Sequence, residues 1–349
     1  TLADLDRLKA GGAHWAHHQD LPSWVGIMPR YGDVSEMKWI QGPVGVSVFH
    51  EVNAYDDGGF VHIDMCLTET NAFSFMREAG GIHKPQQEIQ GALTRWTIDM
   101  SKAEPTIQER PLGPPGDLPR LADADQGRPY SHAWYLSMNP QGGPPMPGGP
   151  VGANFNALLR IEVGNGRLEL MGVPPGAAIS EPAHVPSSEP GHEGWLLSVV
   201  DVPNHPDPAQ QLPGDYSSEL WIVNAGAVAK GPVARVKTGL PLRSQVHGTW
   251  VAREGHCPGP APAGIPAGPR PPGCDKPATL AISSGDNYTG PAISTFFAGA
   301  SMAEVLRRMG YAATAVGNHE FDFGREQFLR NREAAGLLYL GANVKAEQP

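Results

Sequence analysis

The sequence has few charged residues and no long apolar run. Charged side chains make up 18% of the 349 residues, and the formal net charge is -10. Such an acidic chain lacks the basic face that a nucleic-acid polymer requires, which excludes that class of partner. No uninterrupted apolar stretch approaches the length of a membrane-crossing helix, so we expect no membrane span.

Cysteine is scarce as well. The chain has three, Cys66, Cys257 and Cys274, which cannot form a disulfide framework; at most the last two could pair. The first residues, "TLADLDRLKAGG", lack the basic head and apolar middle of a signal peptide, which favours a cytoplasmic protein. Because the chain does not begin with methionine, we expect its true N-terminus to lie upstream.

Glycine and proline, in contrast, are abundant, with 43 and 36 residues. From about residue 20 to 251, short runs of strand-forming residues recur between turn residues, for example "GVSVFHEVNAY", "LTRWTIDM" and "SELWIVNAG". Many short strands with little helical periodicity predict an all-β sandwich, barrel or propeller. The sequence shows no repeat with the length of a propeller blade, so periodicity does not select one of these three folds.

We divide the chain into residues 1–251, 252–276 and 277–349. The middle part contains "PGPAPAGIPAGPRPPG", a composition typical of an extended linker because it cannot bury enough apolar surface to fold. The last part predicts strands at "ATLAISSGD", "AATAVGNHEFD" and "LLYLGANV", with helices over 293–310 and 325–336 between them. Strands alternating with helices are typical of βαβ units around a parallel sheet.

One histidine, His50, lies within a run of apolar residues. Because alternate residues of a strand share a face, we expect His50 on the same side as Val44, Val46, Val48, Val52 and Ala54, opposite Ser47, Glu51 and Asn53. Taken alone, this pattern favours a core histidine bonded to a backbone carbonyl. The segment "AHWAHH" contains three more, His14, His17 and His18, for which flanking Gly and Pro favour surface or structural roles over a metal cluster.

Several segments resemble the carotenoid cleavage oxygenase family, especially its lignostilbene dioxygenase-like branch. "FHEVNAYDDGG", "DLPRL", "EPAHVP" and "VHGTWV" occur in the family's order within about residues 10–251. The resemblance implies a seven-bladed β-propeller with a non-haem Fe(2+) held by four histidines on different blades. The expected fold is therefore mainly β, a partial seven-bladed propeller followed by the Pro/Gly linker and a small α/β fragment.

The resemblance assigns roles to four residues. His50 and His247 match iron ligands, and Glu181 matches a glutamate that orients a ligating imidazole. Asp117 stands where the family has a glutamate, and its shorter side chain is expected to need a shifted backbone or a bridging water. The implied reaction cleaves a carbon–carbon double bond of a hydrophobic carotenoid, apocarotenoid or stilbenoid with O2, giving two carbonyl products.

The family's first two histidine ligands and a further glutamate find no match upstream of His50. Two imidazoles alone would bind iron loosely. We therefore expect the oxygenase activity of this chain to be weak.

Residues 277–349 resemble the N-terminal metallophosphoesterase domain of the 5'-nucleotidase family, through "SSGDNYTG" and "GNHEFDFG". The resemblance implies that Asp286 bridges two divalent metals, Mn(2+) or Zn(2+), that Asn318 binds one of them, and that His319 with Asp322 forms a catalytic dyad. The family's opening Asp-x-His strand and its later metal-binding histidines have no match here, so we expect little phosphatase activity.

Three functions stay open from the sequence: the dioxygenase, which the larger region favours, a metal-dependent phosphoesterase, and a non-catalytic propeller-like binding module. The chain is either a natural bifunctional protein or a join of two truncated genes. Trp134, Tyr135 and Met138 could line a substrate tunnel, although core packing is the expectation. Substrate identity and oligomeric state are not set by the sequence.

Overall fold

We describe the fold from a computed structural model. The residues it describes are 2–3, 6, 9–10, 15–71, 77–79, 90–139, 141, 155–205, 215–239, 247–248, 250, 282–283, 286–288, 294, 296–308, 311, 313–317 and 319–340. The chain divides into two compact units, Thr1–Trp250 and Val251–Pro349, which are described separately. The expected linker at 252–276 lies outside the described residues.

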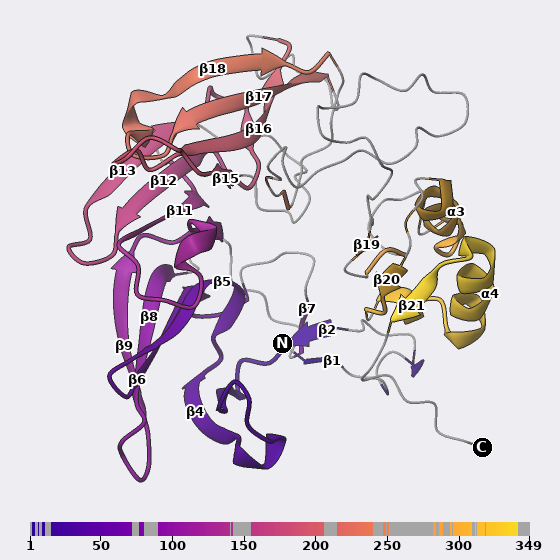
Figure 1. Cartoon of the computed structure of the whole chain (residues 1–349), viewed down its shortest axis with the longest axis horizontal. Helices are drawn as coiled ribbons and strands as arrows, with labels where there is room; N and C mark the ends of the chain where they lie inside the picture. Colours follow the sequence, from indigo (N-terminus) through magenta and orange to yellow (C-terminus); the bar gives the residue numbers. More distant parts are fainter. Residues whose placement is uncertain are drawn as a thin grey trace. The chain divides into compact units, whose positions relative to one another are not determined.

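The first unit is made mainly of antiparallel sheets that follow one another in chain order (Figure 1). The two-stranded sheet contains β3 (Pro22–Ile27) and β4 (Lys38–Val44). The next sheet contains β5 (Ser47–Asp57), β6 (Phe60–Thr68), β8 (Gly91–Asp99) and β9 (Ile107–Gly113). The third contains β10 (Asp117–Arg120), β11 (His132–Ser137), β12 (Ala157–Glu162) and β13 (Leu168–Gly172).

The last large sheet of this unit contains β14 (Ala178–Ile179), β15 (Ala183–Val185), β16 (Trp195–Pro203), β17 (Tyr216–Asn224) and β18 (Pro232–Lys237). A small sheet joins β1 (Leu2–Ala3), β2 (Trp15–His17) and β7 (Arg77–Glu78), with β2 and β7 parallel. Short 3-10 helices occur at Val34–Glu36, Asp123–Asp125 and Val228–Lys230. The prediction of a mainly β chain built from short strands is confirmed.

Apolar side chains fill the spaces between consecutive sheets. Along β11, Trp134 and Leu136 pack toward the β14–β18 sheet, whereas Ala133 and Tyr135 pack toward the β5–β9 sheet. Each of the four has an exposed fraction of 0%. The β10–β13 sheet is therefore buried on both faces, and each large side chain removed from water there stabilises the stack by about 1.5–3 kcal/mol. Stacked antiparallel sheets covered on both faces are what a propeller-like fold requires.

Strand β5 pairs with β6 across a two-residue turn. Asp57 lies opposite Phe60, and the intervening Gly58 and Gly59 have φ of 57° and 90°. Backbone in this left-handed region favours glycine, so the "DDGG" stretch sets the position of the turn.

The regular alternation expected along 44–54 is wrong. The β5–β6 register shifts between Val48 and Glu51 and again between Glu51 and Asn53. As a result Asn53 is buried and Ala54 is exposed, the reverse of the prediction. Bulges insert unpaired residues that rotate the following side chains, and they often occur next to functional sites.

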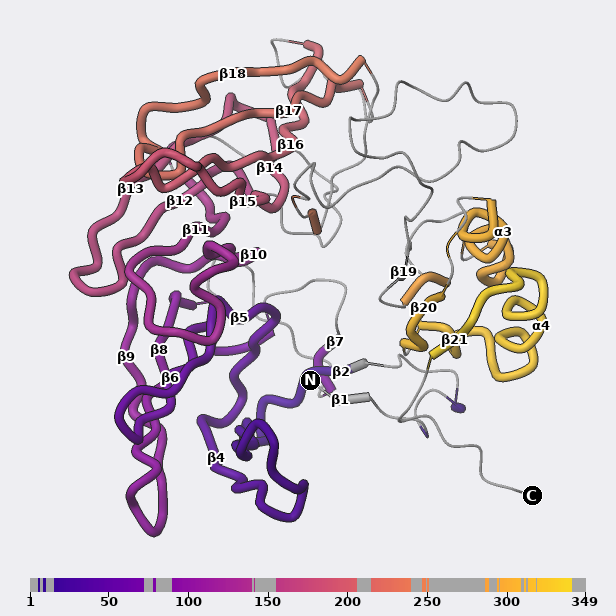
Figure 2. Tube along the Cα trace, in the orientation of Figure 1, coloured from indigo at the N-terminus to yellow at the C-terminus, as the bar shows by residue number. Residues whose placement is uncertain are grey.

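The second unit contains a parallel sheet in the order β19 (Ile282–Ser283), β20 (Ala313–Ala315) and β21 (Leu338–Leu340). Helices α3 (Ala300–Arg308) and α4 (Arg325–Ala335) pack against each other (Figure 2). The expected order of three parallel strands is confirmed. The helix predicted over 293–310 is interrupted, because Ser294 and Phe296 are helical, residues 297–299 form a turn, and α3 begins at Ala300. Ala298 and Gly299, just before it, have φ of 50° and 83°, which a right-handed helix cannot include.

Among the described helices of both units, none is long and apolar enough to cross a membrane.

Candidate metal centre

Two histidines far apart in the sequence meet in the first unit. His50 lies in β5, and His247 lies beyond the last strand of this unit. Their ring centroids are 5.2 Å apart with an interplanar angle of 80°. Two imidazoles bonded to one metal through metal–nitrogen distances of about 2 Å have ring centres roughly 5 Å apart. The observed separation matches that requirement.

His50 is oriented by Asp117, the first residue of β10, which lies next to β5 (Figure 2). The Nδ1 atom of His50 lies 2.8 Å from Oδ1 of Asp117. The same oxygen accepts a hydrogen bond of 2.8 Å from the backbone N–H of Leu118. With 12% of its side chain exposed, Asp117 is held in a nearly dry position. Hydrogen bonding through Nδ1 directs the Nε2 lone pair of His50 outward as a potential metal ligand.

The shorter side chain of Asp117 reaches His50 directly, through a shifted backbone. Leu118 has a φ of 52°, and the pairing of β10 with β11 shifts register between Asp117 and Arg120. Positive φ is costly for a branched residue such as leucine and is retained where the surrounding structure enforces it. This irregular strand carries the carboxylate to the imidazole.

His247 is oriented in the same manner by Glu181. Its Nδ1 lies 2.8 Å from Oε2 of Glu181, whose side chain is only 9% exposed. The His247 side chain itself is 61% exposed. Both imidazoles thus place Nδ1 against a carboxylate and present Nε2 for another partner.

Arg120 was not among the site residues predicted from the sequence, although "DLPR" contains it. Its guanidinium donates to Oε1 of Glu181 at 3.1 Å, to the carbonyl of Pro182 at 3.1 Å and to the carbonyl of Gly248 at 2.5 Å. The signal that could have revealed it is the position, three residues after Asp117 in a family-like stretch. Arg120 therefore contacts the orienting carboxylate and the segment that carries His247.

Opposing effects act on the pKa of His50. Burial lowers it, but the hydrogen bond and charge of Asp117, with the charges of Glu181 and Glu51, outweigh burial and raise it above the ordinary value. The raised pKa stabilises the protonated form of His50 relative to a free imidazole. A metal that takes Nε2 must compete with that proton.

The donor chemistry of this pair fits a ferrous ion. Neutral imidazole nitrogen suits iron, and an orienting carboxylate on the other ring nitrogen is the usual arrangement for a ligating histidine. Among the described residues, neither Nε2 atom has a hydrogen-bond partner. Within the same ranges, no group of three or more His, Cys, Asp or Glu side chains is arranged to hold a metal. The described residues thus bring together the two histidines that the sequence resemblance implies as iron ligands.

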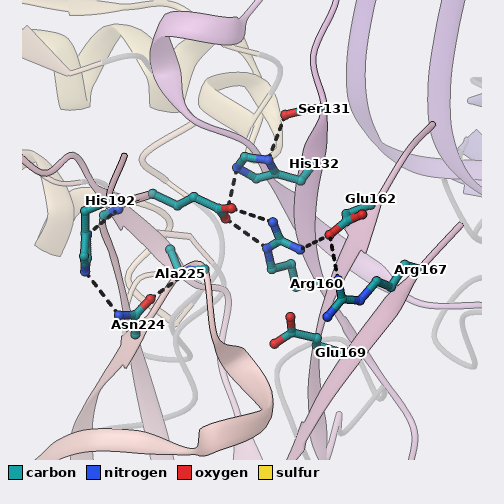
Figure 3. Close-up of polar contacts among 12 residues, drawn as sticks. Ser131, His132, Arg160, Glu162, Arg167, Glu169, His192, Asn224 and Ala225 are labelled. Carbon is teal, nitrogen blue, oxygen red and sulfur yellow. Dashed lines mark hydrogen bonds and ion pairs between the residues drawn. The ribbon is translucent and has the colours of Figure 1, made fainter. Parts of the chain in front are cut away.

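Other histidines have structural contacts. Nε2 of the buried His17 lies 3.0 Å from the carbonyl of Gly45, in line with a structural role. His132 contacts Ser131 through Nδ1 and lies 3.3 Å from Glu193, which also forms an ion pair of 2.6 Å with Arg160 (Figure 3). His14 lies outside the described residues.

Of the three residues considered for a substrate tunnel, Trp134 and Tyr135 are buried and Met138 is exposed. Trp134 and Tyr135 belong to two different core clusters, which agrees with core packing. Met138 has an exposed fraction of 45% and belongs to neither cluster.

In the second unit, the structure brings three of the four predicted residues together. The backbone N–H of His319 donates to Oδ1 of Asp286 at 3.0 Å, and Nδ1 of His319 lies 2.7 Å from Oδ2 of Asp322. The buried Glu320, which the sequence did not single out, accepts from the backbone N–H groups of Asp286 and Gly317 at 2.9 and 2.6 Å. Asn318 lies outside the described residues.

Comparison with known proteins gives matches to the first unit. A sequence model of the family described as "RPE65: Retinal pigment epithelial membrane protein" matches residues 1–252. Lignostilbene-alpha,beta-dioxygenase isozyme III of Sphingomonas paucimobilis is 31% identical over 252 residues, 70% of this chain and 49% of that protein. The crystal structure of Pseudomonas brassicacearum lignostilbene dioxygenase matches with a TM-score of 0.63 and 28% identity, over 71% of this chain and 51% of that chain.

The chain spans about half the length of the curated relatives it matches. A shorter match, of 75 residues, is to the 5'-nucleotidase of Homo sapiens at 37% identity. It covers 21% of this chain and 13% of that protein.

Proposed function

The chain belongs, over residues 1–252, to the retinal pigment epithelial membrane protein family, which includes the carotenoid cleavage oxygenases, and we propose from this that its first unit is an Fe(2+)-dependent oxygenase. The family expected from the sequence is thereby confirmed. The proposed reaction is cleavage of a carbon–carbon double bond in a hydrophobic stilbenoid, carotenoid or apocarotenoid. One oxygen atom of O2 enters each of the two carbonyl products.

The observation that carries this proposal is the convergence of His50 and His247 with their carboxylates. Two rings 5.2 Å apart each have Nδ1 at 2.8 Å from an acidic side chain. The propeller-like stack of sheets brings β5, β10 and the His247 segment together, which supports a metal centre at this point. In this proposal the full assembly is a seven-bladed propeller, to which the described sheets contribute part.

Asp117 and Glu181 have defined tasks in the proposed chemistry. Each accepts a hydrogen bond from the Nδ1–H of its histidine, which fixes the tautomer and makes the imidazole a stronger electron-pair donor at Nε2. Iron bound at Nε2 of both rings would supply the redox chemistry with O2. Neither carboxylate needs to exchange a proton with substrate.

The test is reconstitution with Fe(2+) under anaerobic conditions, followed by addition of O2 with a stilbenoid or an apocarotenoid and assay for aldehyde products. We expect one loosely bound iron per chain and weak aldehyde formation that His247→Ala abolishes. His192→Ala is the matched control, because that histidine contacts Gly194, Trp195 and Asn224 and neither His50 nor His247. Iron binding without cleavage would favour an inactive half-site, and absence of both would favour a non-catalytic binding module.

A second candidate function, metal-dependent phosphoester hydrolysis, is favoured by the contacts of His319 with Asp286 and Asp322. Paired metals such as Mn(2+) or Zn(2+) would supply an activated water. Hydrolysis of a nucleoside monophosphate, dependent on added Mn(2+) and lost in His319→Ala, tests this function. Equal rates in both proteins would contradict it.

A further inference from the structure

We propose that Arg120 is a positioning residue that holds His247 in place for metal binding, acting through Glu181 and the backbone of Gly248. This inference rests on the proposed function of His247 as a ligand. Arg120 does not contact the imidazole itself. It contacts Glu181, which orients the ring, and the backbone of Gly248, the residue after His247.

The two carboxylate oxygens of Glu181 have different partners. Oε1 accepts from Arg120 at 3.1 Å, and Oε2 lies 2.8 Å from Nδ1 of His247. An arginine on one oxygen keeps the carboxylate charged and fixes its rotation. The other oxygen is then held in position to accept a hydrogen bond from Nδ1–H of His247.

Arg120 also holds the backbone next to His247. More than half of that side chain is exposed, so packing alone does not fix it. The guanidinium of Arg120 also bonds the carbonyl of the next residue, Gly248, at 2.5 Å, and the carbonyl of Pro182 at 3.1 Å. One side chain that is 19% exposed therefore ties β10, the Glu181 segment and the His247 segment together.

Strand β10 carries both Asp117 and Arg120. Asp117 and Arg120 are three residues apart, and in a regular strand their side chains would point to opposite faces. The φ of 52° at Leu118 and the register shift remove that alternation. Both side chains then serve the same centre, Asp117 for His50 and Arg120 for His247. The strained backbone at Leu118 has a physical reason in this double task.

The chain contains a matched arrangement outside the centre. Arg160 forms an ion pair of 2.6 Å with Glu193, whose carboxylate lies 3.3 Å from His132 (Figure 3). It has the same order of arginine, glutamate and histidine, with the arginine in β12, the glutamate just before β16 and the histidine in β11, and in the described part of the chain none of the three contacts His50 or His247. Arg160→Met is therefore the control for loss of a buried arginine.

The experiment compares the full chain with Arg120→Met, Arg120→Lys and Arg160→Met. Isothermal titration with Co(2+) gives the metal dissociation constant, and imidazole 15N NMR of the metal-free protein gives the tautomer of each histidine. We expect Arg120→Met to weaken Co(2+) binding about 10–100-fold and to shift His247, but not His50, away from the Nδ1–H tautomer. Arg120→Lys should restore part of the affinity, because an ammonium replaces only one branch of the fork.

Arg160→Met should change the tautomer populations of His132. It should leave the Co(2+) affinity within about twofold of that of the unsubstituted chain. An Arg120→Met protein that keeps both the affinity and the His247 tautomer would overturn the inference. Should Arg120→Met fail to fold, Arg120→Lys decides the question by the same two measurements. Failure of the proposed function looks different: the unsubstituted chain then binds no Co(2+), while the metal-free tautomer of His247 still shows whether Arg120 positions it.

Discussion

At the scale of single residues, the site depends on which ring nitrogen of each histidine carries the proton. Asp117 and Glu181 settle this for His50 and His247 by accepting at Nδ1. Both carboxylates were predicted from short sequence stretches. Their geometry, and the part of Arg120, depend on bulged and irregular strands that no residue pattern specifies.

The raised pKa of His50 predicts the effect of pH on Asp117→Asn. A histidine whose pKa is raised in the folded state adds stability below its unfolded pKa, about 6.5, and this is lost as pH rises through the folded value. Since Asp117 is the main cause of the increase, its neutralisation should lower the free energy of unfolding of the metal-free protein by about 1–3 kcal/mol at pH 5.5, and by less at pH 8.

Urea unfolding at the two pH values measures this difference. The exposed Asp123, replaced by Asn, is the control and should show no such pH dependence. A larger effect of Asp117→Asn at pH 8 than at pH 5.5 would show that the ion pair does not form.

Cys66 gives a second prediction at this scale. Burial raises the pKa of its thiol well above the ordinary value, and the charges of Asp117 and Glu51 act in the same direction. Because the thiolate is the reactive form, iodoacetamide at pH 8 should modify the folded protein at least about 100-fold more slowly than the unfolded one. Mass spectrometry of a Cys257→Ser, Cys274→Ser protein measures Cys66 alone; comparable rates in the two states would place the thiol at the surface.

At the scale of elements, the β10–β13 sheet is the centre of the stack because both of its faces are covered. Turn residues and strand-forming runs predicted many strands, among them β5, β6, β8, β12, β16, β17 and β18. Sequence periodicity failed at β5, because two register shifts change which residues point inward. It also gave no sign of β10, which has only four residues.

Burial along this sheet predicts unequal effects for two similar substitutions. Leu158 in β12 is 0% exposed, whereas Leu170 in the neighbouring β13 is 42% exposed. Leu158→Ala should lower the free energy of unfolding by about 2–5 kcal/mol, through lost burial and the cavity left behind. Leu170→Ala should change it by about 0.5 kcal/mol or less. Thermal or urea unfolding gives both values, and equal losses would mean that the face of β12 that carries Leu158 is not covered.

At the scale of the whole molecule, the two compact units have separate candidate centres. His50, Asp117, Glu181 and His247 all belong to Thr1–Trp250. Asp286 belongs to the other unit, Val251–Pro349. Among the described residues, each candidate ligand of one centre belongs to a single unit.

This separation predicts independent metal binding. Asp286→Ala should leave the Co(2+) dissociation constant of the His50–His247 centre within about twofold, because substitutions at sites without shared partners are additive. Asp117→Asn should raise the same dissociation constant about 10–100-fold. Titration calorimetry of both variants distinguishes the cases, and a tenfold effect of Asp286→Ala would show that the units share a centre.

The sequence by itself determined the mainly β composition of the first unit, the βαβαβ order of the second, the family, and the histidines and carboxylates to examine. These features follow from local propensities, turn residues and short motifs, which act within a few positions of the chain. Only the tertiary structure decided that His50 and His247 are neighbours, that Asp117 reaches its imidazole without a bridging water, and that Arg120 joins three segments. Such contacts join residues far apart in sequence, and they depend on bulges and backbone dihedrals that packing of the sheets imposes.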